Sequence, residues 1–156
     1  MGVVADRLVE LGITLPRAAA PVGSYLPAVQ SGPYVYTSGQ LPFVAGALAV
    51  VGKVGVGAGL VDPTEAAGQA RVAGINAVAA VAALVGDLDQ VKRVVKVTGF
   101  VASDPAFTGQ PGVINGASDV LAQIFGAAGV HARSAVGVAA LPLDSPVEVE
   151  ILVELH

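Results

Sequence analysis

Residues 146–155 read Pro-Val-Glu-Val-Glu-Ile-Leu-Val-Glu-Leu, and their alternation predicts the β-strand from which the fold can be inferred. Successive side chains of a β-strand point to opposite faces of the sheet. One face of the predicted strand is wholly apolar and comprises Val147, Val149, Ile151, Val153 and Leu155. The other face comprises Glu148, Glu150, Leu152 and Glu154. Because this second face still carries apolar groups, we expect it to be covered as well, most economically by another subunit.

Upstream of this strand, helix and strand patterns alternate. Asp62-Pro63-Thr64-Glu65 is a strong helix start, with Asp62 as the cap and Pro63 at the first helical position. That helix should run to about Val85 and stop at Gly86. Further predicted elements are a short helix within 2–11, strands at 25–30, 34–38, 89–101 and 133–140, part of 44–60 as another strand, and a helix at about 110–126. This order predicts a single α+β domain over residues 1–156, with a mixed sheet and its helices on one face.

Composition narrows the function classes. The 156 residues are 54% hydrophobic and only 13% charged, and the net charge is −4. A nucleic-acid partner is therefore not expected, since phosphate backbones require several cations on one face. With no cysteine and two histidines, disulfides, thiolate catalysis and a multi-histidine metal site are not expected either. The N-terminus has no signal-peptide pattern, and the most apolar stretch, Val72–Gly86, contains Asn76 and is short for a membrane span, so we expect a cytoplasmic protein.

Arg133 is the most informative candidate site residue. It lies in His-Ala-Arg-Ser-Ala-Val-Gly-Val (131–138), where a permanent cation begins an apolar strand. A guanidinium at the edge of a core suits bidentate binding of a small carboxylate. The alternative is a structural ion pair with Glu148, Glu150 or Glu154. Counting a simple hairpin about Leu143-Asp144 places Arg133 opposite roughly Glu154.

Other chemical motifs do not fit this sequence. The Gly-rich stretch around Gly52-Lys53 has the wrong spacing for a phosphate loop, and Val54 stands where Ser or Thr must meet magnesium. Residues 116–120 lack the closing glycine of a nucleophile elbow. A serine triad would need His131, for which a solvated loop position is the expected interpretation. His156 is the last residue, and no function is assigned to it.

Several short motifs occur in order along residues 20–155. They are Val-Gly-Ser-Tyr ending at Tyr25, Thr-Ser-Gly-Gln-Leu-Pro at 37–42, Gly-Asp-Leu at 86–88, Asn115, Ala-Arg-Ser at 132–134, Leu141-Pro142, and Val-Glu-Val-Glu at 147–150. In this order and spacing they resemble the RidA family, the YjgF-like reactive-intermediate (enamine/imine) deaminases. The added length relative to compact members resembles a longer, divergent branch of that family.

The resemblance implies a chorismate-mutase-like α+β fold and a homotrimer with ligand clefts between subunits. It also implies that Arg133 binds the carboxylate of a 2-aminoacrylate-type substrate. Glu148 would activate the water that attacks the C=N carbon, releasing ammonia and a 2-keto acid. Tyr25, Ser38, Gly39 and Asn115 would line the cleft. No cofactor is implied, because an imine is already electrophilic.

Departures from the family pattern keep other functions open. Ala135 stands where many deaminating members have cysteine, Gly137 replaces a polar residue, and Ser24 replaces a proline. An N-terminal extension over 1–20 and the long 43–60 segment are additions. These changes favour, as an alternative, a non-catalytic trimer that binds small carboxylates. RNA cleavage is a third hypothesis, which the acidic balance disfavours.

Each lining residue also has a plain structural interpretation. Tyr25 could pack with its hydroxyl in water, and Ser38 and Gly39 could simply form a turn. Asn115 could cap a helix.

Overall fold

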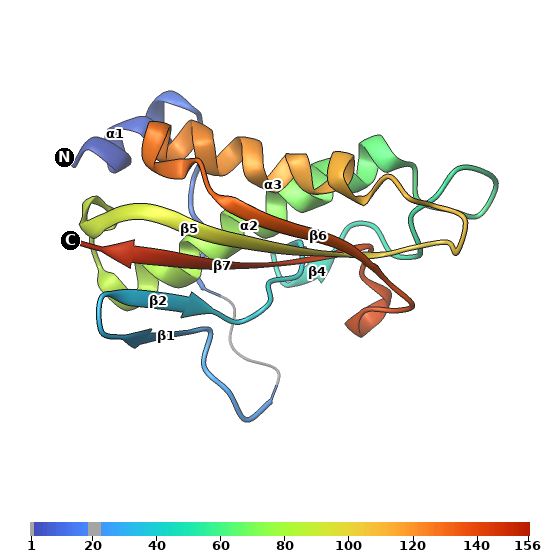
Figure 1. The fold of residues 1–156 in the computed structure, drawn as a ribbon, viewed down its shortest axis with the longest axis horizontal. Coiled ribbons are helices and arrows are strands. Elements are labelled where there is room, and N and C mark those ends of the chain that lie inside the picture. Colours follow the sequence, from blue (N-terminus) through green and yellow to red (C-terminus); the bar gives the residue numbers. More distant parts are fainter. Residues whose placement is uncertain (1, 19–22) are drawn as a thin grey trace.

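A five-stranded sheet with two long helices on one face dominates the computed structural model, which describes residues 2–18 and 23–156 (Figure 1). The sheet order is β1 (Ala28–Ser31), β2 (Tyr34–Thr37), β7 (Val147–Leu155), β5 (Val91–Ala102) and β6 (Ala132–Val138). The helices are α1 (Val3–Glu10), α2 (Pro63–Val85) and α3 (Gln110–Phe125). A small hairpin pairs β3 (Phe43–Val44) with β4 (Ala47–Leu48). The expected α+β fold with a mixed sheet and helices on one face is confirmed.

The two strands at the C-terminal end do not form a hairpin. Strand β6 pairs with β5 in parallel, and β5 lies between β6 and β7. The hairpin that was expected to place Arg133 opposite Glu154 is therefore wrong. Parallel pairing needs a crossover, and α3 supplies it between β5 and β6. The loop that follows, with Leu143 and Asp144 at φ values of 57° and 58°, carries the chain past β5 to its far edge.

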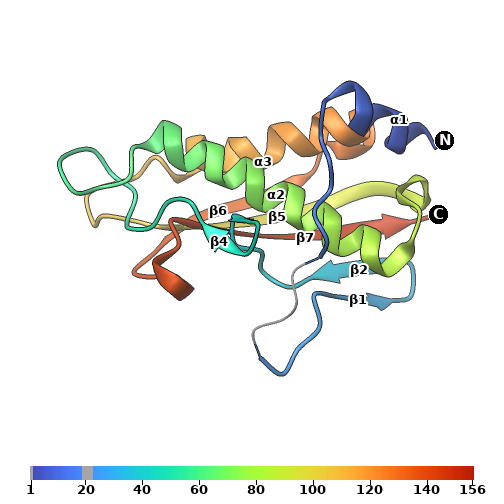
Figure 2. The ribbon, with the colours of Figure 1, turned by 180° about the vertical axis from the view of Figure 1, so that it is seen from behind.

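Helix α2 begins and ends where the sequence predicted. The Asp62 side chain accepts a hydrogen bond from the backbone N–H of Thr64 at 2.8 Å, and Gly86 ends the helix with a φ of 80°. Helices α2 and α3 lie side by side over the sheet (Figure 2). A Cβ at Gly116 would collide with the backbone carbonyl of Ala67, so this glycine allows the two helix backbones to approach closely.

Within the described residues, α2 is the one helix whose length and composition would suffice to cross a membrane. Its 23 residues exceed the shorter apolar stretch expected from the sequence. Half of its most apolar window is buried inside the fold, and it packs on α3 and β7. A core helix passes the same test, so α2 is a weak indication of membrane association.

The remaining elements follow the sequence with small shifts. Helix α1 lies within the predicted range 2–11 and buries Val4 and Leu8. The Asp89 carboxylate accepts hydrogen bonds from the N–H groups of Val3 and Val4, so it caps this helix from a distant part of the chain. The 43–60 segment supplies only the short β3–β4 hairpin and isolated bridges.

The two faces of the sheet differ sharply. On the helix face, alternate residues of β7 are almost fully buried, from Val147 to Leu155. On the other face, here called the open face, no helix of the described residues covers the strands (Figures 1 and 2). Large apolar side chains remain exposed there, namely Val29, Tyr34, Tyr36 and Val136.

Candidate functional site

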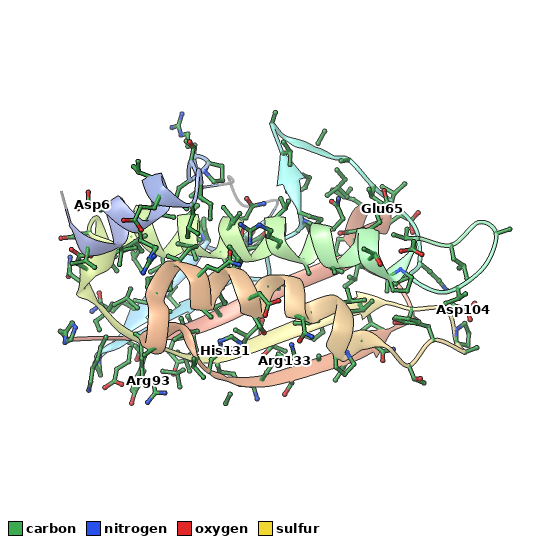
Figure 3. The ribbon with its side chains drawn as sticks, turned by 90° about the horizontal axis from the view of Figure 1, so that it is seen from above. Asp6, Glu65, Arg93, Asp104, His131 and Arg133 are labelled. Atoms are coloured by element: carbon green, nitrogen blue, oxygen red, sulfur yellow. The ribbon has the colours of Figure 1, made fainter. Side chains whose placement is uncertain are left out.

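Arg133 lies on β6, in register with Val97 of β5 and so with the buried Ile151 of β7. Its side chain therefore leaves the sheet on the helix face. It lies along the seam between β6 and α3 (Figure 3). Nη1 donates to Oδ1 of Asn115 at 2.8 Å and to Oγ of Ser118 at 3.2 Å. Nη2 donates to the carbonyl oxygen of Pro111 at 3.2 Å.

All three of these partners are neutral. Among residues 2–18 and 23–156, no carboxylate forms a salt bridge with Arg133. The alternative of an ion pair with Glu148, Glu150 or Glu154 is therefore wrong, and Glu154 instead pairs with Lys92 at 2.8 Å. A guanidinium has five N–H donors, so two of them make no hydrogen bond to the described part of the chain. The charge of Arg133 remains available to an anion.

Glu148 lies on the opposite side of the sheet. It is in register with Phe100 on the open face, where Glu150 is its neighbour two residues along β7. Burial, and secondarily the charge of Glu150, raise the pKa of Glu148 above its ordinary value of 4.5. A carboxylate with a raised pKa is better matched to accepting a proton near neutral pH.

Gly39 makes room for Glu148. A Cβ at position 39 would overlap the Glu148 carboxylate, so no other residue type fits without moving that side chain. The bridge between Gln40 and Val149 holds this segment against β7. Ser38 is anchored next to it, since its hydroxyl donates to the carbonyl oxygen of Leu26 at 2.6 Å. Because Leu26 follows Tyr25 directly, this bond brings the segment of Tyr25 toward Gly39.

The sequence-predicted residues thus form two groups in one chain. Arg133 and Asn115 are bonded to each other and form the arginine half-site. Glu148, Gly39 and Ser38, with the segment of Tyr25, form the glutamate half-site. The half-sites open on opposite faces of the sheet, and Arg133 is two strands away from β7, roughly 10 Å. One chain does not bring Arg133 and Glu148 together. Val22, part of the motif that ends at Tyr25, lies outside the described residues.

Two residues that the sequence did not assign belong to the arginine half-site. Oγ of Ser118 lies 2.9 Å from Nε2 of His131, and Nδ1 of His131 lies 2.6 Å from the carbonyl oxygen of Gly129. His131 lies in a loop, as expected, but it is half-buried and each of its ring nitrogens has a hydrogen-bond partner, so it is not simply solvated. The signal in the sequence was spacing: Asn115 and Ser118 are three residues apart on a helix, and His131 lies two residues before Arg133, just before β6 begins.

Two positions that depart from the family pattern border the arginine half-site on β6. Ala135 is in register with Gly99, and Gly137 lies two residues further along the same face. The space that a side chain at Gly137 would fill is occupied by the amide of Gln110 and the hydroxyl of Ser103. These two groups are themselves bonded at 3.2 Å. Polar groups from α3 and from Ser103, the residue after β5, therefore fill the space beside Gly137.

Known proteins carry the same pattern. Residues 5–155 match the family described as "YjgF/chorismate mutase-like, putative endoribonuclease". The chain belongs to this family. It is 47% identical to Protein TCP17 of Trypanosoma cruzi over 99% of this chain and 96% of that protein.

Solved structures agree with the match. The protein Atu1372 of Agrobacterium tumefaciens, described as of unknown function, is 46% identical, with a TM-score of 0.88 over 98% of this chain and 92% of its own. TdcF of E. coli with bound serine is 27% identical, with a TM-score of 0.62 over 90% of this chain and 94% of its own. The fit to Atu1372 is closer than the fit to TdcF.

Proposed function

We propose that this protein is a RidA-like deaminase that hydrolyses small 2-aminoacrylate-type enamines or imines to 2-keto acids and ammonia, in the cytoplasm. The observation that carries the proposal is the environment of Arg133. Three neutral groups accept hydrogen bonds from its guanidinium, and two of its N–H donors make no hydrogen bond to the described residues. A carboxylate bound by two parallel hydrogen bonds would use these two donors. The serine bound to the relative TdcF also carries a carboxylate, which supports a ligand of this class.

Glu148 is the proposed general base. Water oxygen attacks the C=N carbon while Glu148 accepts a proton from that water and passes it to the nitrogen, which gives a carbinolamine. Glu148 then carries the proton of the new hydroxyl to the amine nitrogen, the C–N bond breaks as the C=O bond forms, and ammonia leaves the 2-keto acid. General-base assistance of this kind contributes about 10²- to 10⁴-fold to the rate. The raised pKa of Glu148 supports this role, because a carboxylate of ordinary pKa is a weaker base.

The proposal requires a second copy of the chain. Because Arg133 and Glu148 leave opposite faces of the sheet, a single cleft can contain both only if they come from different subunits. The exposed apolar groups of the open face, such as Tyr36 and Val136, favour self-association. We propose a homotrimer in which each cleft joins the arginine half-site of one subunit to the glutamate half-site of the next, lined also by Tyr25, Ser38, Gly39 and Asn115.

A non-catalytic binder of small carboxylates is the second candidate. It is favoured by Ala135 and Gly137, two small residues beside Arg133 on β6. The endoribonuclease description of the family suggests RNA cleavage as a third candidate function. The charge balance disfavours it, because the chain has eight Lys and Arg residues and twelve Asp and Glu residues.

Turnover separates these candidates. An imine generated in situ from an amino acid should yield keto acid and ammonia faster with wild-type protein than with Arg133→Ala. We expect the Arg133→Ala variant to lose at least about 10-fold in kcat/KM, since charge-assisted hydrogen bonds contribute about 1.5–3 kcal/mol each. Equal rates for the two proteins would remove the enzyme proposal. Stabilisation by keto acids in a thermal shift, with no turnover, would support the binder.

A further inference from the structure

A chain of hydrogen bonds lies behind Arg133 and runs through Ser118 and His131. Nδ1 of His131 faces the carbonyl oxygen of Gly129 at 2.6 Å, and a carbonyl oxygen can only accept. Nδ1 of the neutral imidazole therefore carries the proton, and Nε2 must accept. The Ser118 hydroxyl, 2.9 Å from Nε2, consequently donates its proton to His131. With its proton thus committed, the Ser118 oxygen is turned to accept the bond from Nη1 of Arg133.

We propose that Ser118 and His131 are positioning residues for Arg133, which fix its guanidinium for the carboxylate of a small 2-keto or 2-imino acid. The inference rests on the proposed function, because it assigns the substrate carboxylate to Arg133. Asn115 and Ser118 occupy both hydrogens of Nη1, and Pro111 occupies one of Nη2. The plane of the guanidinium is thereby set before a ligand arrives. Holding a flexible arginine in advance lowers the entropic cost of binding.

The neutrality of these groups matters as much as their geometry. A carboxylate at position 118 would also hold the guanidinium, but it would neutralise the charge that the ligand needs. A hydroxyl accepts the same bond and leaves the positive charge in place. His131 acts one bond further back, because it accepts the Ser118 proton and so leaves the hydroxyl with a lone pair directed at Arg133.

A serine bonded to histidine can also be a nucleophile and its base. Two features favour positioning over covalent catalysis. The Ser118 oxygen already accepts a bond from a cation, which withdraws electron density from it. The partner of His131 Nδ1 is a neutral carbonyl rather than a carboxylate, so it gives less stabilisation to an imidazolium.

The test compares substrate binding with turnover in the assembled protein. For Ser118→Ala we expect a KM and a Kd for 2-oxobutanoate about 3- to 10-fold above wild type, the value of one ordinary hydrogen bond. kcat should stay within about twofold, because the base and the water are untouched. Ser118→Thr, which keeps the hydroxyl, should restore binding. Thr14→Ala, at an exposed hydroxyl residue in the loop after α1, is the matched control and should bind as wild type.

A double variant tests whether Ser118 and His131 act on Arg133 as one unit or independently of each other. If His131 acts through Ser118, His131→Ala weakens binding, and Ser118→Ala with His131→Ala is no weaker than Ser118→Ala alone. A second measurement does not depend on folding of any variant. Nitrogen-15 spectra of the wild-type imidazole should show a protonated Nδ1 and an unprotonated Nε2.

Four outcomes would overturn the inference: wild-type binding by Ser118→Ala, additive losses in the double variant, the opposite imidazole tautomer, or covalent labelling of Ser118 by a fluorophosphonate with collapse of kcat. Its failure is distinguishable from failure of the proposed function. If Arg133→Ala loses activity while the Ser118 and His131 variants match wild type, only the positioning roles fail. If Arg133→Ala turns over and binds as wild type does, both fail.

Discussion

The two faces of the sheet are built on opposite principles. On the helix face, Gly116 and the alanines of α2 allow backbones to approach closely, and the alternate residues Val147, Val149, Ile151 and Val153 are almost fully buried. On the open face, Glu148 and Glu150 lie two residues apart along β7, on the same face as exposed Tyr36 and Val136. One chain completes the first face and leaves the second incomplete. The helix face is therefore the core of the fold, whereas the open face is the one that we propose meets another subunit.

The largest effect is expected at Glu148. Glu148→Gln keeps the shape but removes the base, so kcat should fall about 10²- to 10⁴-fold. In wild type, Glu148 must be ionised to act, and its pKa is raised above 4.5. The rate should therefore fall as pH drops through a value above 4.5, and this acid limb should disappear in the variant. A pH–rate profile that is flat from neutral pH down to 4.5 would contradict the role of Glu148.

Mixing inactive subunits tests whether the two half-sites meet between chains. Arg133→Ala and Glu148→Gln proteins should each be inactive. If each cleft takes Arg133 from one subunit and Glu148 from another, random reassembly of equal amounts leaves about a quarter of the clefts intact. Activity should then recover to about a quarter of wild type after unfolding and joint refolding. No recovery, with trimers formed, would place both residues of a cleft on one chain.

Glycine-to-alanine substitutions on the two faces should have contrasting effects. A Cβ at Gly116 meets the rigid backbone of Ala67, so Gly116→Ala should lower the free energy of unfolding by about 1–3 kcal/mol or more. A Cβ at Gly39 meets the movable Glu148 carboxylate instead, so Gly39→Ala should lower kcat with little change in melting temperature.

The control for this pair is Gly68→Ala, on an exposed part of α2 with no neighbouring atom within 4 Å. Removing a helical glycine there should raise stability by about 0.4–1 kcal/mol and leave kcat unchanged. Chemical denaturation and turnover of the three variants measure the contrast. Equal losses of stability at Gly39 and Gly116 would mean that the open face is as rigid as the helix face.

The fold could be predicted because its signals are local. Asp62 and Pro63 start α2, Gly86 ends it, and the alternation of residues 147–155 marks a strand with one buried face. The order of the strands depends on contacts between distant parts of the chain. The sequence of Leu143-Asp144 suggested a hairpin, and only the α3 crossover shows why β6 pairs with β5. A turn motif cannot reveal which strand edges are already occupied.

The candidate site divides in the same way. Arg133 and Asn115 were predicted as site residues, and the structure brings them into contact. Ser118 and His131 were missed, because their significance depends on α3 lying against β6 rather than on either motif alone. That Arg133 and Glu148 point to opposite faces also follows from strand order and not from spacing.

The smallest expected effect is on the free energy of unfolding, which the partly buried Glu148 carboxylate lowers at neutral pH. Its pKa is raised in the folded protein, so the unfolded chain loses this proton at a lower pH than the folded one. Protonated Glu148 therefore contributes its full share to the free energy of unfolding below about pH 4.5. That contribution is lost as the pH rises through the pKa of Glu148 in the folded protein. Glu148→Gln has no such loss, so its melting temperature should exceed that of wild type at neutral pH. The difference should close below pH 4.5. A lower melting temperature for Glu148→Gln at neutral pH would show that the carboxylate is stabilised on this face, by another subunit or by Gly39 and its neighbours, and would remove the contrast between the two faces at this residue.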